Sequence, residues 1–152
     1  MNEYQYRRKI YEREEDRRNE WDFAVGLCGI WNVRLKKLPI KYGLDFALMR
    51  GDELRGFLEI KCRGNASTKY SNYLLSLHKM GQAKRLHELT GKPSILAVQF
   101  YECNLCAYLH EVRFTVGFGG RDDRKDWQDN EPVAMISMGD FGSPSGLDVI
   151  RA

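Results

Sequence analysis

Residues 43–61 read GLDFALMRGDELRGFLEIK, and this stretch decides the fold. Apolar side chains alternate with other side chains before and after residues 51–53, which is the period-two pattern of two β-strands joined by a short loop. One face of this hairpin is expected to be apolar. The other face would carry Asp45, Glu59 and Lys61, and two carboxylates beside an ammonium on such a pair of strands need a chemical reason.

The register of the hairpin follows from its loop. If residues 51–53 form a three-residue loop, Arg50 pairs with Leu54, and Asp45 then lies directly opposite Glu59. Cross-strand partners of this kind have Cβ atoms about 5 Å apart. A slip by one residue would expose the apolar side chains to water, so the hydrophobic pattern independently favours one shared face for the charged residues.

Two ionised carboxylates at this separation repel each other, so either one proton is retained or a cation lies between them. Magnesium is usually held by one or two protein carboxylates and takes further oxygens from water and from a substrate phosphate. Lys61, two residues after Glu59, could orient or deprotonate a bound water and offset developing charge. The pattern indicates metal-dependent phosphodiester cleavage, with a solvated sheet face carrying cross-strand ion pairs as the structural alternative.

Asp45 followed by Glu59-Ile60-Lys61 resembles the bipartite motif of the PD-(D/E)xK nuclease superfamily, and residues 15–102 are similar in pattern to archaeal Holliday-junction resolvases. Leu44 stands where the family name places a proline. The resemblance implies an α/β, restriction-endonuclease-like fold with an αβββαβ core, in which helices flank a mixed central sheet. It also implies a DNA endonuclease of the junction, repair or recombination type that depends on Mg²⁺ or Mn²⁺.

The resemblance assigns further residues to the site. The family has a glutamate on a helix before the first strand, and residues 20–29 (EWDFAVGLCG) are similar to that helix, so Glu20 is expected as a catalytic residue and further metal ligand. Gln82 falls where the family often has a polar helix residue, and it is expected to position the substrate or the water. Lys79 is the alternative to Gln82 at that position, and both are expected to contact DNA. Arg63 is expected to contact DNA because of its place in the polar loop after Lys61, although this loop could equally be a plain connection.

Length and composition indicate the number of domains and the kind of protein. The chain has 152 residues, is 43% hydrophobic and shows no shift in composition, which indicates one domain over residues 1–152. No apolar run reaches the roughly 20 residues of a membrane span, and the N-terminus lacks a signal-peptide pattern, so a cytoplasmic protein is expected. The net charge of +3 is compatible with DNA binding without arguing for it. Cys103 and Cys106 have the spacing of half a zinc site or of a tight turn between strands.

Periodicity predicts the remaining elements. Residues 117–126 are glycine-rich and charged but lack the spacing of a phosphate loop, so no nucleotide cofactor is expected, and the segment is either a flexible surface loop or a wrap around substrate. Residues 139–152 show no clear period. The predicted elements are a helix over 3–28 that Gly29 ends as a left-handed cap, strands over 31–38, 94–102, 107–115 and 132–138, and a helix from Ser76 to Thr90 that Gly91 ends.

The sequence also bears on the oligomeric state, the rival function and the substrate. A homodimer that cuts both strands of DNA is expected by analogy with the resolvases. The rival from another class is a non-catalytic DNA-binding or assembly module with the same fold, and retention of Asp45, Glu59 and Lys61 argues against it. No residue excludes RNA as the substrate, and no sequence-reading element distinguishes junctions, nicks, ends and plain duplex.

Overall fold

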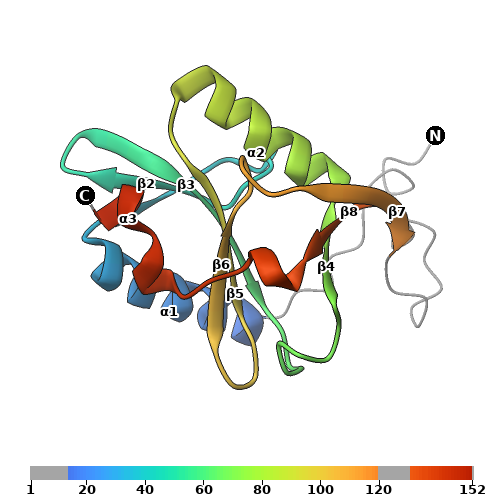
Figure 1. Ribbon diagram of the computed structural model, residues 1–152. Helices are drawn as coiled ribbons and strands as arrows, with labels where there is room; N and C mark the ends of the chain where they lie inside the picture. Colours follow the sequence, from blue (N-terminus) through green and yellow to red (C-terminus); the bar gives the residue numbers. More distant parts are fainter. Residues whose placement is uncertain (1–13, 120–130, 152) are drawn as a thin grey trace, which may run out of the picture.

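The computed structural model describes residues 14–119 and 131–151 (Figure 1). Helices and strands both occur along this length, as expected for a mixed α/β chain. The elements in chain order are α1 (Glu14–Trp31), β1 (Arg34–Lys37), η2 (Ile40–Tyr42), β2 (Phe46–Arg50), β3 (Glu53–Cys62), β4 (Asn72–Ser76), α2 (Leu77–Thr90), β5 (Ser94–Gln99), β6 (Asn104–Tyr108), β7 (Phe114–Gly119), β8 (Glu131–Ser137), η4 (Met138–Asp140), η5 (Pro144–Gly146) and α3 (Asp148–Arg151).

Five strands form the main sheet, in the order β1-β2-β3-β5-β6. β3 pairs with β5 in parallel and with β2 antiparallel, so the sheet is mixed. A parallel pair needs a long crossover connection, and β4 with α2 provides it. This arrangement confirms the predicted α/β, restriction-endonuclease-like fold. A second, three-stranded sheet in the order β4-β8-β7 was not predicted, because α2, β5 and β6 separate β4 from the other two strands in the chain.

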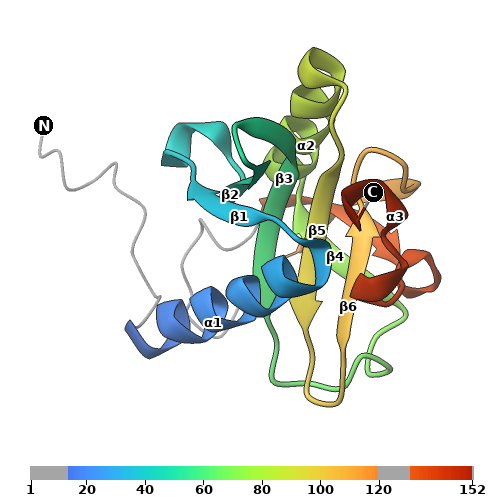
Figure 2. The same ribbon diagram turned by 90° about the vertical axis from the view of Figure 1, so that its left-hand side faces the viewer.

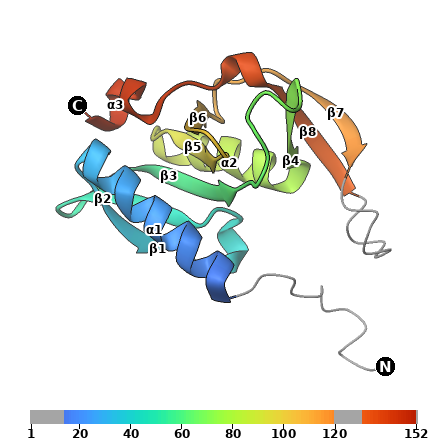
Figure 3. The same ribbon diagram turned by 90° about the horizontal axis from the view of Figure 1, so that it is seen from below.

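The main sheet lies between two covering layers. Figures 2 and 3 show α1 on one side of β3 and the three-stranded sheet on the other. One buried cluster joins α1 and the C-terminal segment to the sheet, and a second joins α2 and the small sheet to its opposite face. The face that carries Glu59 is therefore packed, which excludes the alternative of a solvated sheet face.

Helix α1 runs further than predicted at its C-terminal end. Gly29 lies inside the helix, and Asn32, with φ of 53°, is the left-handed residue that follows it. The Val33 N–H donates to the Cys28 carbonyl at 3.1 Å, as in a Schellman motif. The extra turn buries Trp31 completely, and its Nε1 donates to the Pro144 carbonyl at 2.8 Å. The predicted strand over 31–38 shortens accordingly to β1, and residues 3–13 of the predicted helix lie outside the described residues.

The hairpin loop between β2 and β3 is also shorter than predicted. Arg50 pairs with Glu53, so the loop has two residues and the prediction of a three-residue loop over 51–53 is wrong. Gly51 has φ of 61°, as such tight turns require. Arg55 is then an extra residue in β3, and this bulge shifts the register by one. Nearer the site the predicted register is recovered, with the pairs Leu48–Gly56, Ala47–Phe57 and Phe46–Leu58.

The strand predicted over 107–115 is two strands. β6 pairs with β5 in the main sheet, whereas β7 pairs with β8 in the small sheet. A turn separates them, in which the Val112 N–H donates to the Tyr108 carbonyl at 3.1 Å. The strand predicted over 94–102 ends at Gln99, and the strand predicted over 132–138 is confirmed as β8. Residues 117–119 belong to β7 and not to the predicted loop, of which residues 120–126 lie outside the described residues.

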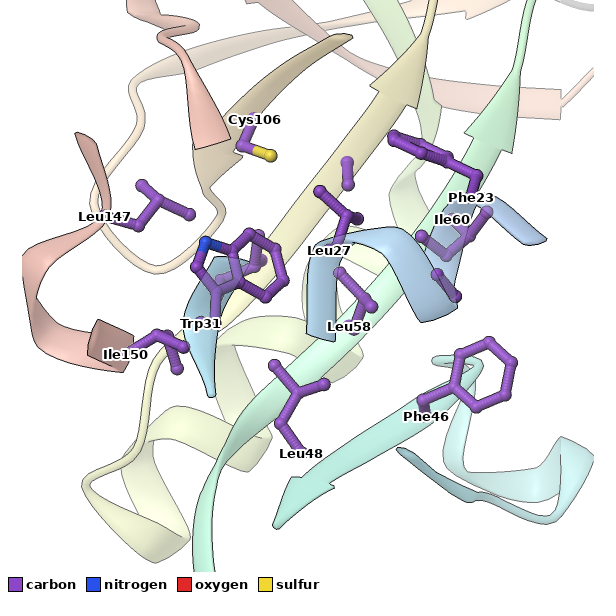
Figure 4. Packing of buried hydrophobic residues seen from close by; sticks show 13 residues of the cluster. Phe23, Leu27, Trp31, Phe46, Leu48, Leu58, Ile60, Cys106, Leu147 and Ile150 are labelled. Atoms are coloured by element: carbon purple, nitrogen blue, oxygen red, sulfur yellow. The ribbon is translucent and has the colours of Figure 1, made fainter. Parts of the chain in front are cut away.

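The C-terminal segment packs although its sequence has no clear period. Leu147 and Ile150 are buried in the α1 cluster, and Figure 4 shows the Trp31 ring among Leu27, Leu147 and Ile150. The Arg50 guanidinium donates to the carbonyls of Trp31, Asn32 and Ile150, so one side chain joins the end of α1 to α3. No helix among the described residues is long and apolar enough to cross a membrane.

Candidate active site

Asp45 and Glu59 meet beside the central strand β3. Asp45 precedes β2, its N–H donates to the Leu58 carbonyl at 3.1 Å, and its Oδ2 accepts the Ile60 N–H at 2.9 Å. Extending the Phe46–Leu58 pair by one residue places Asp45 opposite Glu59, as the sequence predicts. The Asp45 carboxylate is therefore held against the backbone of the strand that carries Glu59.

Glu59 is the only charged residue with a buried side chain among the described residues, with 0% of its surface exposed. Its Oε1 has no hydrogen bond, and its Oε2 is paired with a lysine ammonium. The pKa of this carboxyl is raised from 4.5 to about 7, chiefly by burial and then by the charge of Asp45, while Lys61 and Lys79 lower it. Two close carboxylates, one of them desolvated, form a site that favours a proton or an added cation.

Two lysines approach the same oxygen of Glu59. Lys79 Nζ lies 2.8 Å from Glu59 Oε2, and Lys61 Nζ lies 3.5 Å from it. The Lys79 ammonium also donates to the Gly43 carbonyl at 3.0 Å. Lys61 comes from β3, as predicted, whereas Lys79 comes from the first turns of α2 and was expected as a DNA contact and as the alternative to Gln82 for the polar helix residue near the site. Its ion pair with Glu59 was not foreseen, because no local pattern relates α2 to β3.

Gly43 brings α2 close to the segment that carries Asp45. Its φ is 78°, and a Cβ built on it would lie 2.7 Å from Cγ of Gln82 and 3.6 Å from Nε2 of His78. Gln82 therefore packs beside the site, where it was expected. This turn also breaks the strand alternation, so Leu44 joins the α2-side cluster instead of the face of Phe46.

Glu20 and Arg63 lie at the margins of this group. The pKa of the Cys62 thiol is raised by burial and then by the Glu20 charge, so Glu20 lies near the end of β3. Cys62 packs on the α1 side of the sheet, opposite the face of Glu59. The Arg63 guanidinium lies 5.4 Å from the centre of the Tyr73 ring, and burial raises the pKa of Tyr73 to about 12. The contact between Arg63 and Tyr73 was not predicted, because the sequence around Tyr73 is that of an ordinary strand.

The site fits a hard divalent cation with two protein ligands. Within residues 14–119 and 131–151, no group of three or more His, Cys, Asp or Glu side chains is arranged to hold a metal ion. Asp45 and Glu59 nevertheless supply two oxygen donors, and Glu59 has lone pairs that no hydrogen bond uses. Mg²⁺ is commonly held by one or two carboxylates together with waters, so this donor set is adequate.

Cys103 and Cys106 do not form half a zinc site. Cys106 lies within β6, is buried in the α1-side cluster, and has a pKa raised to about 12 by burial. Cys103 precedes β6, and its Sγ lies 3.7 Å from the Ser67 hydroxyl. One thiol faces the core and the other a surface turn, so the pair lacks a common coordination point.

Comparison with known proteins identifies the family. Residues 6–143 match the profile of a family described as "Phage putative PDDEXK endonuclease". The chain belongs to this PDDEXK endonuclease family. The match confirms the resemblance on which Asp45, Glu59 and Lys61 were selected, and it extends through β7 and β8 into the C-terminal segment.

The fold of this PDDEXK chain is also found among solved structures. It is similar to that of Hjc, a Holliday junction resolvase from the archaeal hyperthermophile Archaeoglobus fulgidus, with a TM-score of 0.52 and 16% sequence identity. The similarity covers 67% of this chain and 79% of the resolvase. Comparison with curated protein sequences gave no match. At this identity the resolvase supports the fold, and the nuclease assignment rests on the family profile.

Proposed function

We propose that this PDDEXK chain hydrolyses phosphodiester bonds of DNA with Mg²⁺ or Mn²⁺ held by Asp45 and Glu59. The observation that carries the proposal is the Glu59 carboxylate, which is fully buried, has no hydrogen bond at Oε1 and lies beside a second carboxylate. If Glu59 only formed a structural ion pair, both of its oxygens would be expected to have hydrogen bonds, because buried polar groups are normally hydrogen-bonded. The family match supports the same reading.

The residues around the carboxylates have separable roles. A divalent ion bound at such a site polarises a phosphate and lowers the pKa of a bound water. Lys61 has a partly exposed side chain near Glu59, so its ammonium can reach a substrate phosphate or hold the attacking water. Its positive charge would offset the negative charge that develops on the phosphate oxygens. Gln82 would position the substrate or the water from α2.

Residues at the margins would extend the contact with DNA. Arg63 follows the catalytic strand and is exposed, so it is proposed to bind a backbone phosphate together with Lys79. Glu20 was expected as a further metal ligand, but no third carboxylate joins Asp45 and Glu59 among the described residues, so it is proposed as a catalytic residue that acts from the end of β3. Its place near Cys62 means that it would approach from the α1 side of the sheet.

The form of DNA that is cut is proposed to be branched or otherwise distorted. The similar fold belongs to a protein described as a Holliday junction resolvase, and the described residues show no separate domain for reading sequence. Two copies of the chain would supply one site for each strand. A homodimer is therefore proposed by analogy, and sedimentation of the purified chain would test it.

The test is cleavage of a panel of supercoiled, linear, single-stranded and four-way-junction DNA with Mg²⁺, Mn²⁺ or chelator. Lys61→Ala is expected to lower the rate at least about a hundredfold while leaving the fold intact. Lys92→Ala, beyond the far end of α2, is the matched control and should cut like the wild type. An RNA panel run in parallel would show whether the substrate class is DNA.

Metal-independent cutting, or cutting that survives Lys61→Ala, would overturn the proposed mechanism. DNA binding without cleavage under all conditions would instead favour the non-catalytic module. That alternative has no supporting observation at present, because Asp45, Glu59 and Lys61 are all retained and adjacent.

A further inference from the structure

Lys79 connects the two chain segments that carry the carboxylates. Its Nζ lies 2.8 Å from Glu59 Oε2 on β3 and donates to the Gly43 carbonyl at 3.0 Å. Gly43 precedes Asp45 by two residues, and the Asp45 side chain is itself bonded to β3 at Ile60. A single ammonium therefore joins α2, the Asp45 segment and the central strand.

This ammonium is also the nearest cation to Glu59. Lys61 Nζ is further away, at 3.5 Å from the same oxygen. A fully buried carboxylate such as Glu59 requires a charge partner, because burying an isolated charge is very costly. The Lys79 side chain is 28% exposed, so its ammonium has access to water if the pair is broken.

We propose that Lys79 occupies the cation position of Glu59 in the metal-free protein, and that it competes there with the divalent ion. Lys79 is thus a positioning residue that keeps the site assembled before metal binds and sets the affinity for the metal. The inference rests on the proposed function in one respect, namely that Asp45 and Glu59 are the metal ligands.

The competition follows from the geometry. Lys79 already lies within contact distance of Glu59 Oε2, so a second cation on this carboxylate meets electrostatic repulsion from the ammonium. Weakening the Lys79–Glu59 pair leaves Lys79 with the Gly43 carbonyl as a remaining partner. The ammonium then stays close to the site and can meet a substrate phosphate. Lys79 would therefore pair with Glu59 in the metal-free site and contact a substrate phosphate in the metal-bound site.

The experiment measures Mn²⁺ binding without DNA, by titration calorimetry at about pH 8, which is above the pKa of Glu59. Lys79→Met removes the charge and keeps the apolar stem, and Lys79→Gln is the second variant because its amide can still donate to Gly43. Both are expected to bind Mn²⁺ at least about fivefold more tightly than the wild type, in the usual range of coupling between sites. Lys84→Met on the same helix, where Lys84 lies over the Phe114 ring, should leave the affinity unchanged.

Thermal unfolding provides a second readout. In chelator, both Lys79 variants should melt below the wild type, because Glu59 has lost its closest partner. Saturating Mn²⁺ should restore most of that loss, so the increase in Tm caused by metal is larger in the variants than in the wild type.

Unchanged or weaker Mn²⁺ binding in both Lys79 variants would overturn the proposal, as would a loss of Tm that metal does not restore. Asp45→Asn separates this failure from failure of the proposed function. If Asp45→Asn binds Mn²⁺ as tightly as the wild type, the metal site itself is refuted. If Asp45→Asn abolishes binding while the Lys79 variants leave it unchanged, only the role of Lys79 is refuted.

Discussion

Replacing Glu59 by glutamine should remove a pH dependence that this one carboxyl imposes on stability. Its pKa in the folded protein is about 7, whereas an unperturbed glutamate has 4.5. Between these two values the folded chain keeps a proton that the unfolded chain has lost. The contribution of Glu59 to the free energy of unfolding therefore falls as pH rises from about 4.5 to 7, and is constant above that range. Glutamine does not titrate.

The magnitude follows from the same pKa. A pKa difference of one corresponds to about 1.4 kcal/mol, so the shift from 4.5 to about 7 amounts to about 3 kcal/mol over the whole window. Roughly 2 kcal/mol of this falls between about pH 5 and 7.5, where the fold is easier to measure. Glu59→Gln also loses the ion pairs with Lys61 and Lys79, so the measured quantity is the trend of the difference with pH and not its absolute level.

Urea unfolding in chelator at several pH values tests the prediction. The free energy of unfolding of the wild type minus that of Glu59→Gln should fall by about 2 kcal/mol from pH 5 to 7.5 and then level off. Glu88→Gln, at an exposed carboxylate of α2, should show no such trend. A difference that is constant with pH, or that rises with pH, would mean that Glu59 is already ionised in the metal-free protein and would refute the reasoning.

Three further outcomes are expected. Arg50→Met should lower the free energy of unfolding by about 2–3 kcal/mol in urea, because three carbonyls lose their donor, whereas Arg34→Met, which loses one exposed bond to the loop, should cost less than about 1 kcal/mol. Gly43→Ala should reduce cleavage and destabilise more than Gly51→Ala, since both have positive φ but only Gly43 lacks room for a Cβ; equal losses would contradict this. Mn²⁺ should raise the Tm of the wild type and not that of Asp45→Asn.

The sequence predicts the local elements of this fold better than the contacts between them. The period-two pattern of the β2–β3 hairpin identifies both strands and the register at Asp45 and Glu59, even though the loop has a different length. Two errors cancel there: the loop is one residue shorter than predicted, and the bulge at Arg55 adds that residue back. Such a bulge has no sequence signal that periodicity can detect.

The contacts that periodicity misses are those between distant segments. Gly29 is a reasonable helix end by residue type, but burial of Trp31 against the C-terminal segment outweighs it and extends α1. Lys79 was expected as a DNA contact, and its ion pair with Glu59 depends on how α2 lies over β3. A pattern argument does place Gln82 and Lys79 on one face of α2, three residues apart, but it does not say which strand they face.

The hydrogen bond from Trp31 to Pro144 spans 113 residues. During synthesis, the Trp31 side chain at the end of α1 can therefore form this hydrogen bond only after Pro144 has been added. Closing so long a loop is entropically costly, and folds dominated by distant contacts form slowly. We expect β3 to pair with its hairpin partner β2 early, while the layer formed by α1 and the C-terminal segment closes late. A nascent chain would then bring Asp45 and Glu59 together while its core is still incomplete, so the candidate site and full stability would arise at different times.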